Sequence, residues 1–256
     1  MGLMDDVRRG LVAAGKEIAR EISNQQSDQA ARTAAEDPLL PELAVSAVEE
    51  WKVAGQPEQK AIPWPRDAWV QEFPDLRKVL QGLPDPLSRD DVTNLVRGLP
   101  ETDDGAVAAF VACMAWGYGK TGYGRTRTLA VLNSSRSVPT KLAEARRIAS
   151  EGGLRAAFDS YEFLAGDGRL HNLGPAFGTK YIFFHNHEGL ILDRLTADWY
   201  HRASGVDLKP TVWSPKNYRE YLAFMGGWAE TLGITPQELE QIAFTQMSRE
   251  RGNQWG

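Results

Sequence analysis

The chain has 256 residues, 42% of them hydrophobic and 25% charged, an ordinary composition for a globular protein that buries a sizeable core. No apolar run approaches the roughly 20 residues that a membrane span needs, and the single cysteine, Cys113, excludes an internal disulfide and a thiolate zinc site. The net charge of −5 argues against a nucleic-acid partner, but residues 1–116, 117–202 and 203–256 carry net charges of −8, +4 and −1, so the middle third has the sign of a phosphate-binding surface.

The chain begins with a predicted helix and an extended segment. The first 35 residues are predicted to be helical, because apolar residues recur at three- and four-residue steps over residues 3–18. Three prolines and two tryptophans follow over residues 56–69, and we expect an extended strap whose tryptophans anchor it to a core. We therefore assign residues 1–70 to an N-terminal helix with a strap, and residues 71–256 to a helical domain.

From about residue 74 onward, helix signals follow one another and strand signals are almost absent. Ser88 precedes two acidic residues in a predicted first helical turn, and Thr235 with Glu238 forms a capping box. The apolar run Ala106–Trp116 predicts a further helix, and only Lys180–Phe184 could form a strand. Many medium-length helices with short loops predict an all-α fold.

The function depends most on a predicted helical hairpin near residues 165–185. One helix is expected to end near Leu170, a turn with Gly174 and Pro175 follows, and a second helix is expected to begin near Gly178. Such a hairpin exposes glycine N–H groups and a helix N-terminus, which can hold a phosphate. On the pattern alone, a plain turn between two helices is the commoner structure.

A lysine and an aspartate follow this hairpin. Asp193 comes 13 residues after Lys180, behind an apolar triplet and before a helical pattern. This order places the carboxylate near a helix N-terminus, where the helix dipole favours its anionic form. Lys180 and Asp193 together predict a catalytic pair, whereas each by itself is also compatible with a surface lysine or an ordinary N-cap.

The order of hairpin, Gly178-Thr179-Lys180 and Asp193 resembles the helix–hairpin–helix DNA glycosylases, in particular the bacterial branch similar to 8-oxoguanine DNA glycosylase (OGG). The resemblance implies two helical lobes with a cleft between them. It also implies that Lys180 is the nucleophile, that Asp193 assists it, and that the partner is double-stranded DNA containing a modified base. The hairpin residues Gly174, Gly178 and Thr179 would then contact the DNA.

The glycine-rich loop after residue 116 is a further match to this family. There, the corresponding helix leads into a loop that wedges into the duplex where the base was removed, which implies DNA contacts at Gly117, Tyr118, Gly119, Tyr123 and Arg125. Aromatic side chains could stack on the excised base, although aromatics at helical spacing mostly belong to the core. The candidates for this base pocket are Phe177, Trp199 and Trp213.

The resemblance also implies a mechanism. A base inside a duplex must be flipped out before a protein group can reach its glycosidic carbon. Lys180 would attack C1′ and form a Schiff base, for which its amine must be neutral, a state that burial or a neighbouring cation such as Arg194 would favour. Asp193 would stabilise the cationic sugar or move protons, and the Schiff base would also permit strand nicking as an abasic-site lyase. No cofactor and no metal are expected.

Other functions remain open at this stage. Gly119-Lys120-Thr121 is similar to the end of a P-loop, but Met114 replaces the required glycine, which excludes an NTPase. His185 and His187 could support a metal-dependent nuclease, and a helical DNA-binding module without catalysis is a third class. The damaged base could be 8-oxoguanine, or a modified base in phage DNA. We expect a cytoplasmic monomer that associates with the nucleoid when bound to DNA, and no membrane partner.

Overall fold

The computed structural model describes residues 40–252, so the helix predicted over the first 35 residues lies outside the described residues. Residues 40–252 belong to one compact unit, Leu40–Gly256, in which the strap packs together with the helices that follow it. The division of the chain at residue 70 and the arrangement in two lobes stay predictions.

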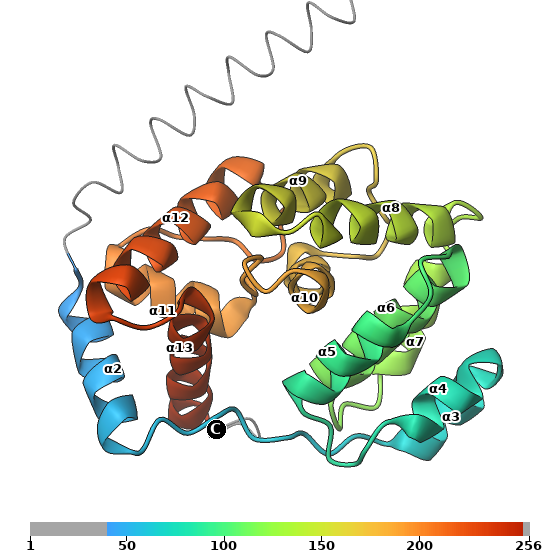
Figure 1. Cartoon of the computed structure of the whole chain (residues 1–256), viewed down its shortest axis with the longest axis horizontal. Helices are drawn as coiled ribbons and strands as arrows, with labels where there is room; N and C mark the ends of the chain where they lie inside the picture. The colour runs from blue at the N-terminus through green and yellow to red at the C-terminus, as the bar shows by residue number, and fades with distance from the viewer. Residues whose placement is uncertain (1–39, 253–256) are drawn as a thin grey trace, which may run out of the picture. The chain divides into compact units, whose positions relative to one another are not determined.

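The described part of the chain is helical, and its one pair of bridged extended residues is Ile62 and Leu87. This confirms the all-α class. The helices follow one another with short connections (Figure 1), and their bounds are α2 (Glu42–Val53), α3 (Arg66–Glu72), the 3-10 helix η1 (Pro74–Leu76), α4 (Arg77–Gly82), α5 (Arg89–Gly98), α6 (Asp103–Tyr118), α7 (Gly124–Leu132), α8 (Val138–Ser150), α9 (Gly153–Ala165), α10 (Pro175–His185), α11 (Arg194–Ser204), α12 (Pro215–Leu232) and α13 (Pro236–Glu250). Among residues 40–252, no helix has the length and apolar character that crossing a bilayer requires.

Two helices are apolar on almost every face and lie inside the molecule. α6 is buried along nearly its whole length, and α10 is surrounded by α5, α6, α8 and α9. Figure 1 shows α10 nearly end-on, with α8 and α9 on one side and α5 and α6 on another. A helix without a polar face is stable only when packed on all sides, and α10 therefore forms the centre to which the other elements attach.

The structure corrects two boundaries around α10 and the predicted type of one of its segments. No helix ends near Leu170, because α9 already ends at Ala165 with Gly166 as its C-cap, and α10 begins at Pro175 rather than near Gly178. Gly174 is the N-cap and proline takes the first helical position, where its missing N–H costs nothing. Lys180–Phe184 is helical rather than a strand, because the apolar run is enclosed by other helices.

The strap is extended up to α3, and its tryptophans are anchored as expected. Trp64 is buried and donates its indole N–H to the carbonyl oxygen of Pro84 at 2.8 Å. Trp69 is fully buried, but it belongs to the short helix α3 rather than to the extended segment. The capping boxes at Ser88 and Thr235 are both present, which confirms the starts of α5 and α13.

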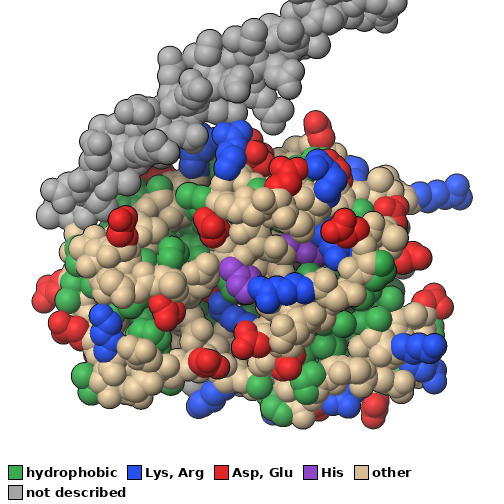
Figure 2. Space-filling view, viewed as in Figure 1, with side chains coloured by type: hydrophobic (Ala, Val, Ile, Leu, Met, Phe, Trp, Pro, Cys, Tyr) green, Lys and Arg blue, Asp and Glu red, His purple; other side chains and the backbone are tan. Residues whose placement is uncertain are grey.

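Charges of both signs are interspersed on the face shown in Figure 2, with histidine side chains near its centre. This face therefore carries no continuous basic surface.

Candidate active site

Lys180 and Asp193 lie in direct contact. The Lys180 Nζ donates to Asp193 Oδ2 at 2.7 Å, and the two side chains are only 7% and 15% exposed. Lys180 Nζ also lies 3.4 Å from the carbonyl oxygen of Ala176, one turn earlier in α10. A buried amine that contacts a carboxylate can exchange a proton with it, and both groups retain a narrow opening to solvent.

Asp193 is the N-cap of α11, as the sequence predicts. Its Oδ1 accepts the backbone N–H groups of Leu195 and Thr196 at 2.9 and 3.3 Å, and the Thr196 hydroxyl accepts the Asp193 N–H at 2.9 Å. Burial alone would raise the pKa of Asp193, but the Lys180 ammonium and these backbone N–H donors outweigh it, so the pKa lies below its ordinary value. The carboxylate thus stays ionised while it holds the lysine.

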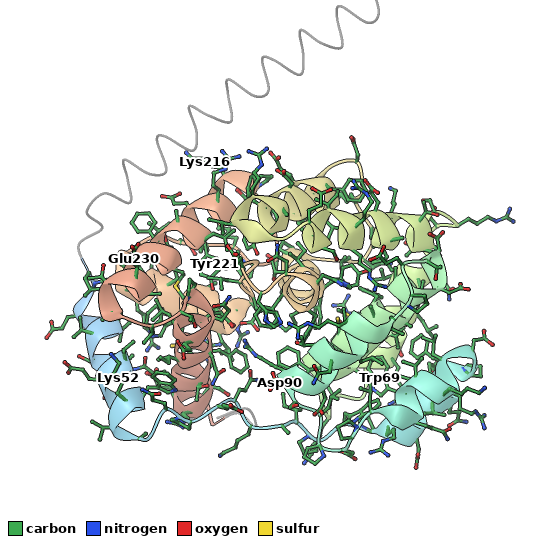
Figure 3. All side chains as sticks on the ribbon, in the orientation of Figure 1. Lys52, Trp69, Asp90, Lys216, Tyr221 and Glu230 are labelled. Carbon is green, nitrogen blue, oxygen red and sulfur yellow. The ribbon has the colours of Figure 1, made fainter. Side chains whose placement is uncertain are left out.

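The segment Leu190–Leu192, which precedes Asp193 in the chain, has no regular secondary structure and is buried. Such a segment cannot satisfy its own backbone polar groups, and side-chain hydroxyls do so instead. Tyr218 and Tyr221 of α12 donate to the carbonyl oxygens of Leu190 and Ile191 at 2.9 and 3.0 Å; Tyr221 is labelled in Figure 3. These bonds fix the aspartate relative to α12.

Thr179 takes a different role from the expected DNA contact. Its side chain is fully buried, donates to the carbonyl oxygen of Pro175 at 2.9 Å, and accepts the backbone N–H of Leu192 at 3.0 Å. It therefore joins α10 to the segment that ends at Asp193. The prediction of a phosphate contact through Thr179 is wrong, because its hydroxyl points into the core.

Gly178 is likewise covered rather than open to DNA. A Cβ added there would lie 2.3 Å from the Trp213 ring, whose indole N–H donates to the carbonyl oxygen of Leu173 at 3.1 Å. Gly178 therefore allows an indole to pack on α10, and the expected contact through this glycine is corrected accordingly. Trp213 packs against Tyr161 as well. Gly174 has open space around it, so its predicted DNA contact stays a prediction.

The end of α6 packs against the start of α10 beside the lysine. A Cβ on Gly117 would lie 2.9 Å from the Phe177 ring and 3.1 Å from Lys180 Cδ. Phe177 stacks on Tyr118, with ring centroids 4.2 Å apart, and its own centroid lies 5.4 Å from Lys180 Nζ. Gly117, Tyr118 and Phe177 thus form one wall next to Lys180.

The loop after α6 projects further outward. Gly119 ends the helix with φ +51° and ψ −127°, a conformation that favours glycine. Tyr123 is 60% exposed and meets Tyr118 edge-on. Arg125 lies 4.0 Å from a Glu72 carboxylate oxygen. The loop presents an exposed aromatic ring against Tyr118, which stacks on the Phe177 ring next to the lysine, and the DNA contacts assigned to it stay predictions.

Trp199 does not belong to this site surface. Its ring is fully buried between α11 and the C-terminal helices, near Trp228, and its indole N–H donates to Gln246 at 2.8 Å. We therefore correct its assignment to the base pocket: the ring has no exposed face on which a base could stack.

Sequence reasoning missed a second buried ion pair near the first. Arg89 at the start of α5 makes two bonds to Glu240 of α13, at 2.7 and 3.3 Å, and Glu240 is fully buried. Glu240 is close enough to Asp193 and Lys180 for both charges to act on its pKa. The available signal was an acid on the apolar stripe of α13, which also includes Ala243 and Met247.

The two histidines considered as metal ligands have other surroundings. His187 stacks on Phe183 and lies 3.2 Å from the Thr93 hydroxyl, and His185 meets the Tyr181 ring edge-on. Burial lowers the pKa of His185 to about 3, so it is neutral. Over residues 40–252, no group of three His, Cys, Asp or Glu side chains is placed to share a metal ion.

Comparison with protein families identifies the family to which the chain belongs. Residues 55–244 match the family model described as "Putative 8-oxoguanine DNA glycosylase OGG-like protein". The chain belongs to this family. The match spans α3 to α12 and most of α13, and it includes both members of each buried ion pair. No curated protein and no solved structure matches the chain. Membership of the OGG-like family makes DNA the expected substrate.

Proposed function

We propose that the protein is a DNA glycosylase that removes a modified base from duplex DNA, with Lys180 as the nucleophile. The observation that carries this proposal is the 2.7 Å contact between Lys180 Nζ and Asp193 Oδ2, with both side chains nearly buried. Membership of the OGG-like family supports the reaction class. Duplex DNA is the partner in this proposal, and a monomer in the cytoplasm would carry out the reaction.

The ion pair between Lys180 and Asp193 makes a proton transfer the first step of the reaction. The Lys180 ammonium must lose a proton before its nitrogen can attack, and the Asp193 carboxylate is the acceptor in contact with it. The neutral nitrogen then forms a bond to C1′ as the bond from C1′ to the base breaks. The electron pair of that bond leaves with the base, which takes up a proton. Once Asp193 passes its proton to the departing base, its restored negative charge stabilises the positive charge that develops on the sugar.

The covalent adduct formed in this step reacts further while it is bound to Lys180. The C1′–O4′ bond opens, O4′ takes the proton that the nitrogen loses, and a Schiff base remains between Lys180 and C1′. Water can hydrolyse the Schiff base and release an abasic site. Alternatively, loss of a C2′ proton expels the 3′ phosphate and nicks the strand. Lyase activity is thus part of the proposal.

The base needs a space near the lysine, and a pocket lined in part by Phe183 of α10 is the candidate. Phe183 follows Lys180 by three positions, which places both on one face of the helix. Phe183 bounds a pocket of about 450 Å³, which is large enough for a flipped base. Its walls carry hydrogen-bonding groups suited to a heteroaromatic edge, including Gln59, Thr93, His187 and Gln241. We assign this pocket to the base, and Phe177 and Tyr118 to the side from which DNA enters.

Borohydride trapping tests the nucleophile. Reduction of the Schiff base on duplexes with single modified bases should give a covalent protein–DNA adduct with the wild-type chain. Lys180→Gln should give none, while Lys216→Gln, at an exposed lysine on α12, should trap as the wild type does. Undiminished trapping by Lys180→Gln would remove the assignment, and absence of trapping by the wild type on any modified base would remove the Schiff-base mechanism.

The same duplexes identify the substrate. We propose 8-oxoguanine as the first base to test, since the family model carries that name. A base that occurs only in phage DNA is the alternative, and it would make the protein an antiviral defence factor. Release of the free base, scored separately from strand nicking, distinguishes the glycosylase from the lyase step.

A further inference from the structure

Arg194 is the first residue of α11 and follows Asp193 directly in the chain. Its side chain is exposed, whereas the Asp193 side chain is only 15% exposed and contacts the buried Lys180 amine at 2.7 Å. An exposed cation therefore lies one residue from the carboxylate of the candidate active site.

Arg194 is the arginine of α11 that has no acidic partner in the described part of the chain. The acid one turn later, Asp198, is bonded to Arg251 after the end of α13. The other arginine of α11, Arg202, is bonded to Glu250 at 2.6 Å. The first turn of α11 contains no acidic residue. Within the described residues, no ion pair occupies the Arg194 guanidinium.

Helix stability does not explain an arginine at this position. The first turn of a helix lies at the positive end of the helix dipole, where an acidic residue is favoured and a cation is disfavoured. Asp193 agrees with this preference as the N-cap, and Arg194 has the opposite charge one residue later. Residues that break such a local rule without a compensating contact in the protein are expected at functional sites.

The charges of the site favour an anion as the partner of Arg194. Lys180 and Asp193 have opposite charges that cancel, so Arg194 supplies the excess positive charge. In the proposed reaction, a sugar C1′ must come within bonding distance of Lys180 Nζ, and phosphate groups flank every sugar inside a DNA strand. Because Asp193 contacts that nitrogen, such a phosphate comes within reach of the long side chain next to Asp193. A guanidinium can bind a phosphate through two N–H donors.

We propose that Arg194 binds a phosphate group that flanks the nucleotide whose sugar faces Lys180. The inference rests on the proposed function and adds a DNA-binding residue outside the helical hairpin and the loop after α6. The contact holds the sugar in front of the ion pair and offsets the repulsion between the phosphate and the Asp193 carboxylate. Arg194 takes no part in the bonds that form and break.

DNA binding by the full chain, measured as a function of salt concentration, tests this proposal. A duplex with a tetrahydrofuran abasic analogue has no base to remove, so fluorescence anisotropy measures its binding without reaction. Arg194→Gln should weaken binding about tenfold or more. The slope of log Kd against log salt should fall by about one unit, the value for one lost phosphate contact. Arg194→Lys should keep the slope but not the full affinity, because an ammonium lacks the planar fork of a guanidinium.

Arg202→Gln is the matched control. It removes the other arginine of α11, whose side chain is 50% exposed and already paired with Glu250, so affinity and slope should stay near the wild-type values. Thermal unfolding separates binding from a structural role: Arg194→Gln should keep or slightly raise the melting temperature, since it removes a cation from the start of a helix. Equal slopes for Arg194→Gln and the wild type would overturn the proposal.

Neutral methylphosphonates locate the phosphate. Each phosphate around the abasic analogue is replaced in turn, which removes one backbone charge at a time. Wild-type binding should weaken at a position that flanks the analogue, and Arg194→Gln should show little further loss at that same position. Equal losses for the two proteins at every position would contradict the contact.

Borohydride trapping separates this inference from the proposed function. If the wild type is trapped and Arg194→Gln keeps the wild-type slope, the inference about Arg194 fails alone. If the slope falls in Arg194→Gln while the wild type is not trapped on any modified base, the proposed nucleophile fails and the phosphate contact stands. Absence of DNA binding by the wild type would remove both.

Discussion

At the scale of single residues, Asp193 combines two functions that are usually separate. It caps α11 and it pairs with Lys180. Asparagine caps a helix about as well as aspartate, so the two functions can be separated by one substitution. In Asp193→Asn, the ion pair with Lys180 should be lost while the start of α11 is kept.

Asp193→Asn should therefore impair catalysis more than folding. We expect the single-turnover rate of base release to fall by about 10²–10⁴-fold, the range of a lost acid–base or charge contribution. Circular dichroism should show unchanged helix content. A rate within a few-fold of wild type would show that the carboxylate charge is dispensable.

The same substitution has a consequence for stability in acid. The pKa of Asp193 is lower in the folded state than in the unfolded chain, so its contribution is complete above about pH 4 and is lost as pH falls through the folded value. Chemical unfolding below pH 4 should therefore show a smaller pH-dependent loss for Asp193→Asn than for wild type.

At the scale of elements, the segment Leu190–Leu192 matters because it has no partner strand or helix of its own. Its backbone groups depend on Thr179, Tyr218 and Tyr221. Loss of any one of these hydrogen bonds should therefore shift the position of Asp193, which follows the segment directly.

Thr179→Val tests this connection. The change keeps the shape of the side chain but leaves the buried Leu192 N–H without an acceptor, which should cost about 1–3 kcal/mol of unfolding free energy. Thr231→Val is the matched control, because the Thr231 hydroxyl makes the same kind of bond back to Gly227 on an exposed face of α12. An equal loss in both variants would contradict the role of Thr179.

Gly178 offers a second test at this scale. Gly178→Ala forces a methyl group against the Trp213 ring and should lower the melting temperature. Gly226→Ala, inside α12 with open space around it, should instead raise stability by roughly 0.5–1 kcal/mol, since alanine favours a helix over glycine. Thermal unfolding of the two variants measures the expected loss of stability in the first and the expected gain in the second.

The sequence predicts the starts of some helices well and those of others poorly. Capping residues predict the starts of α5, α11 and α13, because an N-cap bonds only to residues two or three positions along the chain. The start of α10 was placed three residues late because Gly178, a pattern signal for exposed backbone, is in fact a packing site for Trp213. That contact joins positions 35 residues apart, and no local pattern reports it.

At the scale of the whole molecule, buried ionisable groups decide how stability changes with pH. His185 is enclosed by the core, with its pKa lowered to about 3 by burial and by Arg146. The unfolded chain takes up a proton at this residue below about pH 6.5 and the folded chain does not, so stability falls as pH drops from that value toward 3.

His185→Phe removes this proton uptake and keeps an aromatic ring next to Tyr181. The melting temperature of the variant should fall less between pH 7.5 and pH 5 than that of the wild type. Identical pH dependence of the two chains would show that His185 is protonated in the folded state as well. Glu240 is present in both chains, so its own titration does not affect the comparison.

The pair proposed as catalytic could be found in the sequence, but its surroundings could not. Lys180 and Asp193 are visible as a motif with a fixed order. Arg89 and Glu240 lie 151 positions apart and become neighbours only in the folded chain. Trp199 was assigned to the base pocket because an aromatic on a helix has the same appearance in sequence whether its ring faces a ligand or the core.

The hydroxyl-bound segment before Asp193 also has a consequence for the proposed reaction on DNA. Thr179 of α10 holds the segment that carries the aspartate, and α10 carries the lysine, so the two side chains are fixed relative to one another by the fold. In the proposed glycosylase, a duplex would therefore meet a lysine and a carboxylate that are already paired. Discrimination between bases would then arise from which nucleotide reaches this pair.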